Sequence, residues 1–202
     1  MAQLRLSVVI AVGVVVWLAV VGLGLHRIWA YSTEPGAEAS APGHWPADST
    51  IDRSTVRPTL VMFLHPMCTC SRASLAELDA IMRAAGDRLE TVVVVHRPDD
   101  VDDEWDRSGI WNAVRRLRGV AIRTDRDGAE ALRFGAATSG QVLVYGPEGE
   151  LRFAGGITGS RGHEGDNPGR QRVLAVVEKA ASVSPAHSVY GCSLGTVEGT
   201  GR

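Results

Sequence analysis

The clearest indication of the fold is the stretch TLVMFLHPMCTCSRASLAEL, residues 59–78. The apolar run after Thr59 is of strand length and is rich in Leu, Val and Phe, which is typical of a buried strand ending before Pro66. Beyond the two cysteines, apolar side chains recur at the three- and four-residue spacing of one helix face. The cysteines therefore lie between the end of a strand and the start of a helix.

Cys68 and Cys70 are the predicted catalytic residues. Backbone N–H groups and the helix dipole at a helix N-terminus stabilise negative charge, which lowers a thiol pKa and raises the thiolate fraction. Because one residue separates the two cysteines, a bond between them requires a turn and closes a small, strained ring. The other arrangement keeps Cys68 as nucleophile and brings Cys192 as resolving thiol. A third interpretation, unreactive cysteines packed as small apolar side chains, stays open.

The composition is that of a globular protein with an unusual N-terminus. The chain has 202 residues, 45 % hydrophobic content and a formal net charge of −2, which suits one core plus attachments. Such a near-neutral balance gives no electrostatic reason to expect a nucleic-acid partner.

The N-terminus predicts a membrane anchor. Residues 7–25 carry no charge and are long enough to span a bilayer as a helix. Residues 29–32 match a signal-peptide cleavage site poorly, so an uncleaved anchor over residues 1–27 is favoured. We expect a single-pass protein of the cytoplasmic (inner) membrane. Because Arg5 and Arg27 flank the span, positive charge does not decide its orientation.

The rest of the chain divides into three predicted parts. Residues 28–56 contain several prolines without apolar periodicity and predict a flexible linker. Residues 57–184 suit one compact domain, and residues 185–202 form a tail that carries Cys192. Within the domain, apolar runs and helical spacings alternate in the order β-α-β-α-β-α-β-β-α. Further strands are expected at residues 91–96, 120–123, 141–145 and 151–154, with a last helix capped by Asn167.

The cysteine motif in residues 63–74, the hairpin after residue 141, and the segments 155–158 and 160–167 together carry a family resemblance. The chain resembles the thioredoxin fold, and more closely the RedB-type, membrane-anchored thioredoxin-like proteins, over residues 57–195. The resemblance implies an α/β fold with a mixed central sheet flanked by helices and an N-terminal transmembrane helix. It also implies a thiol–disulfide role outside the cytoplasm, with protein thiols and disulfides as partners, no cofactor, and a domain facing the periplasm or cell exterior.

Two departures separate this sequence from ordinary thioredoxins. Thioredoxins use Cys-x-x-Cys, whereas Cys68 and Cys70 have a single spacer. Thioredoxins also place a cis-proline before their fourth strand, opposite the cysteines, and the matching residues 138–141 contain no proline here. Both departures concern the residues of thioredoxin-type exchange activity, and neither changes the expected fold.

Three further residues are candidate supporting groups. His65 stands three positions before Cys68 and Arg72 four positions after it, and a positive charge on either would depress the thiol pKa. Both also fit solvent-exposed positions without a role. His163 lies in a glycine-rich segment, where it is either a proton shuttle near Cys68, a metal ligand or an ordinary loop residue.

A metal-binding interpretation competes with exchange chemistry. Cys68, Cys70 and His163, with Cys192 as a further candidate, form a soft sulfur and imidazole set suited to Cu(I) or Zn(II). This set is similar to that of Sco-type copper chaperones, which implies copper as the alternative cofactor. A third alternative is a non-catalytic thioredoxin-like binding module with one static disulfide. Metal content after purification under reducing conditions separates the first two hypotheses.

Overall fold

The computed structural model describes residues 2–37, 40–99, 101, 105–107, 109–179 and 187–195. The chain divides into two compact units, Met1–Glu34 and Pro35–Arg202. The first boundary therefore falls later than the predicted end of the anchor at residue 27.

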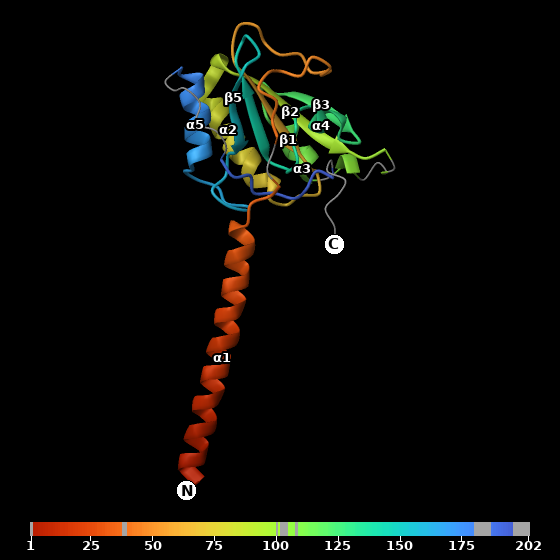
Figure 1. Cartoon of the computed structure of the whole chain (residues 1–202). Coiled ribbons are helices and arrows are strands. Elements are labelled where there is room, and N and C mark those ends of the chain that lie inside the picture. The colour runs from red at the N-terminus through yellow and green to blue at the C-terminus, as the bar shows by residue number, and fades with distance from the viewer. Residues whose placement is uncertain are drawn as a thin grey trace. The chain divides into compact units, whose positions relative to one another are not determined.

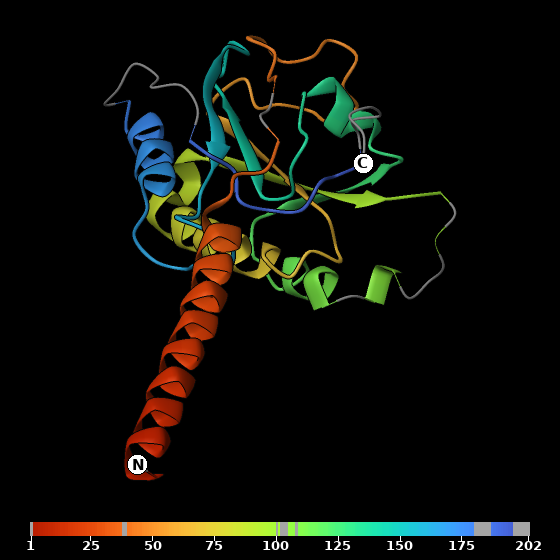
Figure 2. The same cartoon turned by 60° about the horizontal axis from the view of Figure 1, so that its bottom comes forward.

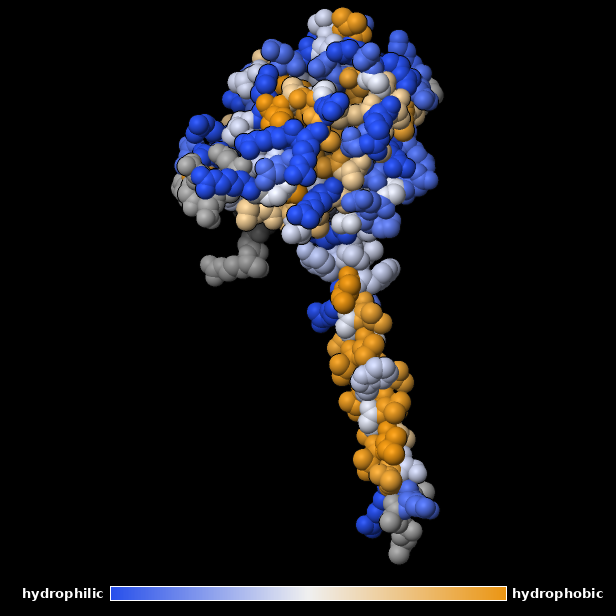
Figure 3. All heavy atoms as spheres, turned by 180° about the vertical axis from the view of Figure 1, so that it is seen from behind, coloured by the Kyte–Doolittle hydropathy of each residue, from blue (hydrophilic) through white to orange (hydrophobic). Residues whose placement is uncertain are grey.

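The first unit is a helix, α1 (Ala2–Thr33), whose apolar side chains are exposed. Among the described residues it is the one helix long and apolar enough to cross a membrane, since an 18-residue window within the span Arg5–Thr33 has a mean hydropathy of 2.8. Figure 3 shows the contrast between the apolar side chains of α1 and the mixed surface of the other unit. This helix confirms the sequence-based expectation of an apolar segment of membrane-spanning length.

The second unit is built on a five-stranded sheet in the order β3-β2-β1-β4-β5 (Figure 1). Its strands are β1 (Thr59–Leu64), β2 (Glu90–Arg97), β3 (Ala121–Arg126), β4 (Gln141–Tyr145) and β5 (Leu151–Gly156). β1, β2 and β3 are parallel, whereas β4 runs antiparallel to β1 and β5 antiparallel to β4. The sheet is therefore mixed, and β1, which leads to the cysteines, is its central strand.

The helices connect these strands in the expected order. They are α2 (Ser71–Ala85), α3 (Gly109–Val114), α4 (Ala129–Arg133) and α5 (Pro168–Val177), with 3-10 turns η1 (Gly86–Arg88) and η2 (Trp105–Arg107). Asn167 caps α5 as predicted, because its side-chain oxygen accepts a hydrogen bond of 2.8 Å from the Arg170 amide. Pro168 at the first helical position loses no intrahelical hydrogen bond.

Alternate side chains of each strand supply two separate apolar layers. Leu60, Met62 and Leu64 of β1 face the layer that contains α2, α3 and α5. Val61 and Phe63 face the other layer, which contains α4. The helices thus cover opposite faces of the sheet (Figure 2), and β1 is buried on both sides.

The segment predicted to be a flexible linker packs against this second face. Trp45 meets Phe134 and Tyr145 edge-on, with ring centroids 5.0 and 5.2 Å apart, and Ile51 is only 3 % exposed. The physical reason is the short α4, whose five residues leave much of the sheet face to be covered by other parts of the chain. The expected flexible linker over residues 28–56 is therefore wrong for this part of the segment.

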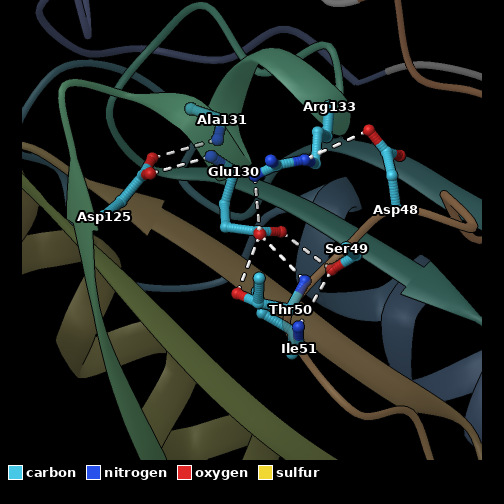
Figure 4. Close-up of polar contacts among 8 residues, drawn as sticks. All are labelled: Asp48, Ser49, Thr50, Ile51, Asp125, Glu130, Ala131 and Arg133. Carbon is cyan, nitrogen blue, oxygen red and sulfur yellow. Dashed lines mark hydrogen bonds and ion pairs between the residues drawn. The ribbon is translucent and has the colours of Figure 1, made fainter.

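A polar network fixes the same segment to α4 (Figure 4). The Glu130 carboxylate accepts hydrogen bonds from the Ser49 hydroxyl at 2.8 Å and from the Thr50 amide and hydroxyl at 2.9 Å each. Asp125, at the end of β3, accepts the backbone amides of Glu130 and Ala131 at 2.8 and 3.0 Å. These contacts hold residues 49–51 in one conformation.

The C-terminal segment, residues 187–195, also packs on the domain. His187 makes a parallel bridge to Gly155, and Ser193 makes an antiparallel bridge to Thr138. Leu194 is 1 % exposed and joins the apolar layer that contains α4. The compact unit therefore extends beyond the predicted boundary at residue 184, and Cys192 belongs to a segment that is part of it.

Candidate functional site

The turn between β1 and α2 positions Cys68. The Cys68 amide donates to the His65 carbonyl at 3.0 Å, and the Ser71 amide donates to the Cys68 carbonyl at 3.1 Å. Cys70 is the N-cap residue of α2. Pro66 cannot extend β1, and the chain turns after it so that the first amide of α2, that of Ser71, points back to the Cys68 carbonyl.

The structure brings the three cysteines together. Cys68 is buried with only 1 % of its surface exposed, Cys70 is half-buried, and Cys192 is exposed. All three are free thiols. Both the side chain and the backbone of Cys192 form hydrogen bonds with Cys68. The Cys70 side chain also hydrogen-bonds Cys68, so both candidate partners lie beside it, and the fold brings Cys192 there from the far end of the chain.

The electrostatics favour the thiolate at Cys68. Burial alone would raise the pKa of this thiol, but hydrogen bonds from Cys192, from the Ser71 hydroxyl and from the Cys70 amide outweigh burial and lower the pKa. Burial and the negative charge of Cys68 raise the pKa of Cys70. Although Cys192 is exposed as a residue, partial desolvation of its thiol and the hydrogen bond to Cys68 raise its pKa to about 12. The shared negative charge therefore resides on Cys68.

Arg161 is the positive charge that reaches the cysteines. It lowers the pKa of Cys70 and of Cys192, in each case against the larger effect of burial. Its Nη1 donates to the Gly191 carbonyl at 2.5 Å. The sequence indicated Arg72 instead, but Arg72 is exposed, and a Cβ added at Gly109 of α3 would lie 3.2 Å from its Nη2. Arg72 therefore takes the solvent-exposed position that the sequence also allowed.

A buried carboxylate holds the loop that carries Arg161. Glu77 of α2 accepts hydrogen bonds from the Gly165 amide at 2.6 Å and from Arg170 at 2.7 Å, with its side chain 4 % exposed. Breaking a buried ion pair costs about 3–5 kcal/mol, whereas an exposed pair such as Arg83–Asp79 on the same helix contributes about 0–1 kcal/mol. Glu77 is thus the main polar contact between α2 and the glycine-rich loop.

His65 acts through its ring nitrogen rather than through a charge. Burial, together with the charge of His96, lowers the pKa of His65, so the ring is neutral near neutral pH. Its Nδ1 accepts the Met67 amide at 3.2 Å, inside the turn that leads to Cys68. The ring stacks on His96 at 5.6 Å and meets Trp105 edge-on at 5.2 Å. The lowered pKa of His65 argues against a positive charge near neutral pH, and its contact with the Met67 amide makes the ring part of the turn.

His163 does not join the cysteines. It is exposed and lies beside Gly159 and Gly165 of its own loop. Within the described ranges, no group of three or more His, Cys, Asp or Glu side chains is arranged to hold a metal ion. The alternative metal set of Cys68, Cys70 and His163 is thus not assembled in this structure.

Comparisons with known proteins found solved structures that share this architecture. No family model matches the chain, and no curated protein matches it. A hypothetical protein of Sinorhizobium meliloti superposes with a TM-score of 0.58 at 19 % identity, over 83 % of this chain and 97 % of that one. An uncharacterised conserved protein of Geobacillus kaustophilus gives a TM-score of 0.56 at 15 % identity, over 80 % and 91 %. This chain itself has three parallel strands, then an antiparallel hairpin and a closing helix, which is the order expected for a thioredoxin-like fold. The fold is thioredoxin-like.

A third solved structure is more distant. The secreted disulfide oxidoreductase of Mycobacterium tuberculosis, described as homologous to E. coli DsbE, gives a TM-score of 0.44 at 15 % identity, over 62 % of this chain and 83 % of that one. Identities below 25 % limit these likenesses to the fold. The narrower likeness to RedB-type proteins stays a prediction.

Ser139 lies in the segment of residues 138–141, which matches the cis-proline position of thioredoxins and contains no proline. Every peptide bond in the described part of the chain is trans. The Ser139 hydroxyl accepts the His65 amide at 2.8 Å and lies 2.9 Å from the Ser71 hydroxyl, which in turn hydrogen-bonds Cys68. Ser71 and Ser139 are functional candidates that the sequence analysis missed.

Proposed function

We propose that the protein is a membrane-tethered, extracytoplasmic thiol–disulfide exchange protein in which Cys68 is the nucleophile. The observation that carries the proposal is the set of hydrogen bonds from Cys192, Ser71 and Cys70 to the Cys68 sulfur, which favours its thiolate. The thiolate is the form that attacks disulfides, so a lowered pKa raises the reactive fraction at neutral pH. The partners are disulfides of other proteins, and the exchange needs no cofactor.

The proposed reaction balances as two exchanges. The Cys68 thiolate attacks one sulfur of the partner disulfide, a mixed disulfide forms, and the other partner sulfur leaves as a thiolate that takes up a proton. A second thiol of this chain then attacks Cys68 and releases the remaining partner sulfur. The partner disulfide is reduced to two thiols, while two thiols of this chain are oxidised to a disulfide. The same steps in reverse oxidise a partner.

Cys192 is the favoured resolving thiol in this proposal, with Cys70 as the alternative. The Cys192 thiol donates its hydrogen bond to Cys68, so the two sulfurs are already neighbours. The negative charge of Cys68 contributes to the raised pKa of Cys192. This charge disappears once Cys68 enters a mixed disulfide, and Arg161 continues to favour the Cys192 thiolate. Cys192 therefore becomes more reactive at the step that needs it.

The tether in this proposal is α1, which is long and apolar enough to cross a membrane. An uncleaved helix would place the domain at the outer face of the cytoplasmic membrane, in the periplasm or cell exterior. Disulfide exchange suits that side, because the cytoplasm keeps most thiols reduced.

The pH dependence of Cys68 alkylation tests the proposal. We expect the rate to be half-maximal at a lower pH than in a cysteine peptide, because the lowered pKa keeps Cys68 ionised until the pH falls through that pKa. The measurement is iodoacetamide labelling over a pH series, with each cysteine quantified by mass spectrometry. The midpoint does not depend on access to the buried sulfur, and a midpoint at or above that of a cysteine peptide would refute the proposed nucleophile.

A further inference from the structure

The structure places the C-terminal segment over the reactive cysteine, and we infer that this segment is an internal competitor of the partner protein. The segment pairs through its main chain with residues 137–139. This pairing must break before an extended, disulfide-bearing segment of a partner can reach Cys68. This inference rests on the proposed exchange function and adds a step that controls it.

Backbone pairing shows how the segment is seated. The Ser139 amide donates to the Cys192 carbonyl at 2.8 Å, and the Leu194 amide donates to the Ala137 carbonyl at 2.9 Å. These bonds are those of an antiparallel strand pair centred on Thr138 and Ser193. Main-chain pairing of this kind is largely independent of side-chain identity, so another extended segment can replace it. The dark-blue trace in Figure 2 follows the return of this segment across the domain.

Gly191 and Arg161 fix the approach of the segment. A Cβ at Gly191 would lie 1.9 Å from the Ser139 carbonyl oxygen, which is a backbone atom and cannot swing aside. The Gly191 carbonyl accepts the hydrogen bond from Arg161. Glycine therefore permits a contact that any other residue would break, and Arg161 reaches both this contact and the cysteines beside it.

The burial of Cys68 makes release of the segment necessary. Because Cys68 is only 1 % exposed, a disulfide carried by another chain cannot come into line with its sulfur for attack. Cys192 contacts this sulfur through both its thiol and its amide. Local opening of residues 187–195 therefore supplies the access that the partner disulfide needs.

Because the C-terminal segment and the partner compete for residues 137–139, the steps of the reaction follow a fixed order. The partner displaces the segment, Cys68 attacks the partner disulfide, and the mixed disulfide forms as described above. When the segment returns, it displaces the partner from residues 137–139 and carries Cys192 to the mixed disulfide. Cys192 then attacks Cys68, the partner sulfur leaves as a thiolate, and a Cys68–Cys192 bond remains.

The test compares Gly191→Ala with Gly43→Ala, in which a Cβ meets nothing within 4 Å. The probe is a cystine-bridged peptide, and formation of the Cys68 mixed disulfide is followed over pH by mass spectrometry. For Gly191→Ala we expect the rate at the high-pH plateau to rise at least about tenfold. This plateau rate is proportional to the fraction of molecules in which residues 187–195 are displaced, and the added Cβ increases that fraction. The midpoint should move upward, since the open form lacks the Cys192 donors. Gly43→Ala should match the parent chain in both quantities.

A measurement on the Cys192→Ser variant complements these rates. Hydrogen exchange is followed for the Leu194 and Ser139 amides before and after capture of the peptide as a mixed disulfide on Cys192→Ser. We expect the Leu194 amide to lose protection while the Ser139 amide keeps it, because the peptide takes over the edge. Unchanged protection at Leu194, or an unchanged plateau for a folded Gly191→Ala, would overturn the competitor role. Exchange itself would fail in a different way, with no mixed disulfide at Cys68 in any variant.

Discussion

Cys68→Ser is expected to abolish exchange with protein disulfides, lowering the initial rate by roughly a thousandfold or more. Cys68 is the sulfur whose pKa is lowered by the hydrogen bonds from Cys192, Ser71 and Cys70. A serine hydroxyl in the same place is not ionised near neutral pH and forms no disulfide. The measurement is reduction of a fluorescently labelled disulfide peptide by the reduced protein.

Cys70→Ser is the matched control for this variant. It makes the same sulfur-to-oxygen change two residues away, at a half-buried thiol whose pKa is raised by burial and by the charge of Cys68. We expect Cys70→Ser to keep most of the parent initial rate. If Cys68→Ser retained a tenth or more of that rate, or if only Cys70→Ser were inactive, Cys68 would not be the attacking thiol.

Cys192→Ser is expected to accumulate a mixed disulfide between Cys68 and the partner. The hydroxyl can still donate a hydrogen bond to Cys68, so the first attack proceeds, but the second attack lacks its sulfur. We expect most of the protein to be trapped after one turnover, and the rate of multiple turnovers to fall about 100-fold or more. Non-reducing mass spectrometry of the reaction with a disulfide peptide measures the trapped species.

The comparison with Cys70→Ser assigns the resolving thiol. Under our proposal Cys70→Ser releases its partner at nearly the parent rate, because Cys192 remains next to Cys68. Trapping by Cys70→Ser with free turnover of Cys192→Ser would instead make Cys70 the resolving residue. In that case Cys192 would serve only as a donor to the Cys68 thiolate.

The core of the fold could be predicted because its signals are local. The apolar run before Pro66 forms β1, and the helical spacing after Cys70 forms α2. Placing the cysteines at this junction required only the change from strand to helix periodicity. The cap at Asn167 was likewise readable from two adjacent residues.

The parts that were wrong depend on contacts between distant residues. Trp45 lies in a proline-containing stretch without periodicity, and only the incomplete cover of the sheet face explains why it is packed. The seating of Cys192 depends on main-chain bonds to Ser139, which leave no pattern in side chains. Arg161 rather than Arg72 reaches the thiols because Glu77 anchors the glycine-rich loop to α2. Proximity in sequence to Cys68 favoured the wrong arginine.

The most direct test of exchange at Cys68 is disulfide mapping of the full chain after equilibration in a series of glutathione redox buffers. Exchange at Cys68 should produce a bond between Cys68 and Cys192 that forms and opens reversibly across the series, with Cys70 free. Absence of any disulfide that includes Cys68 at every ratio, or a bond that no buffer opens, would contradict it.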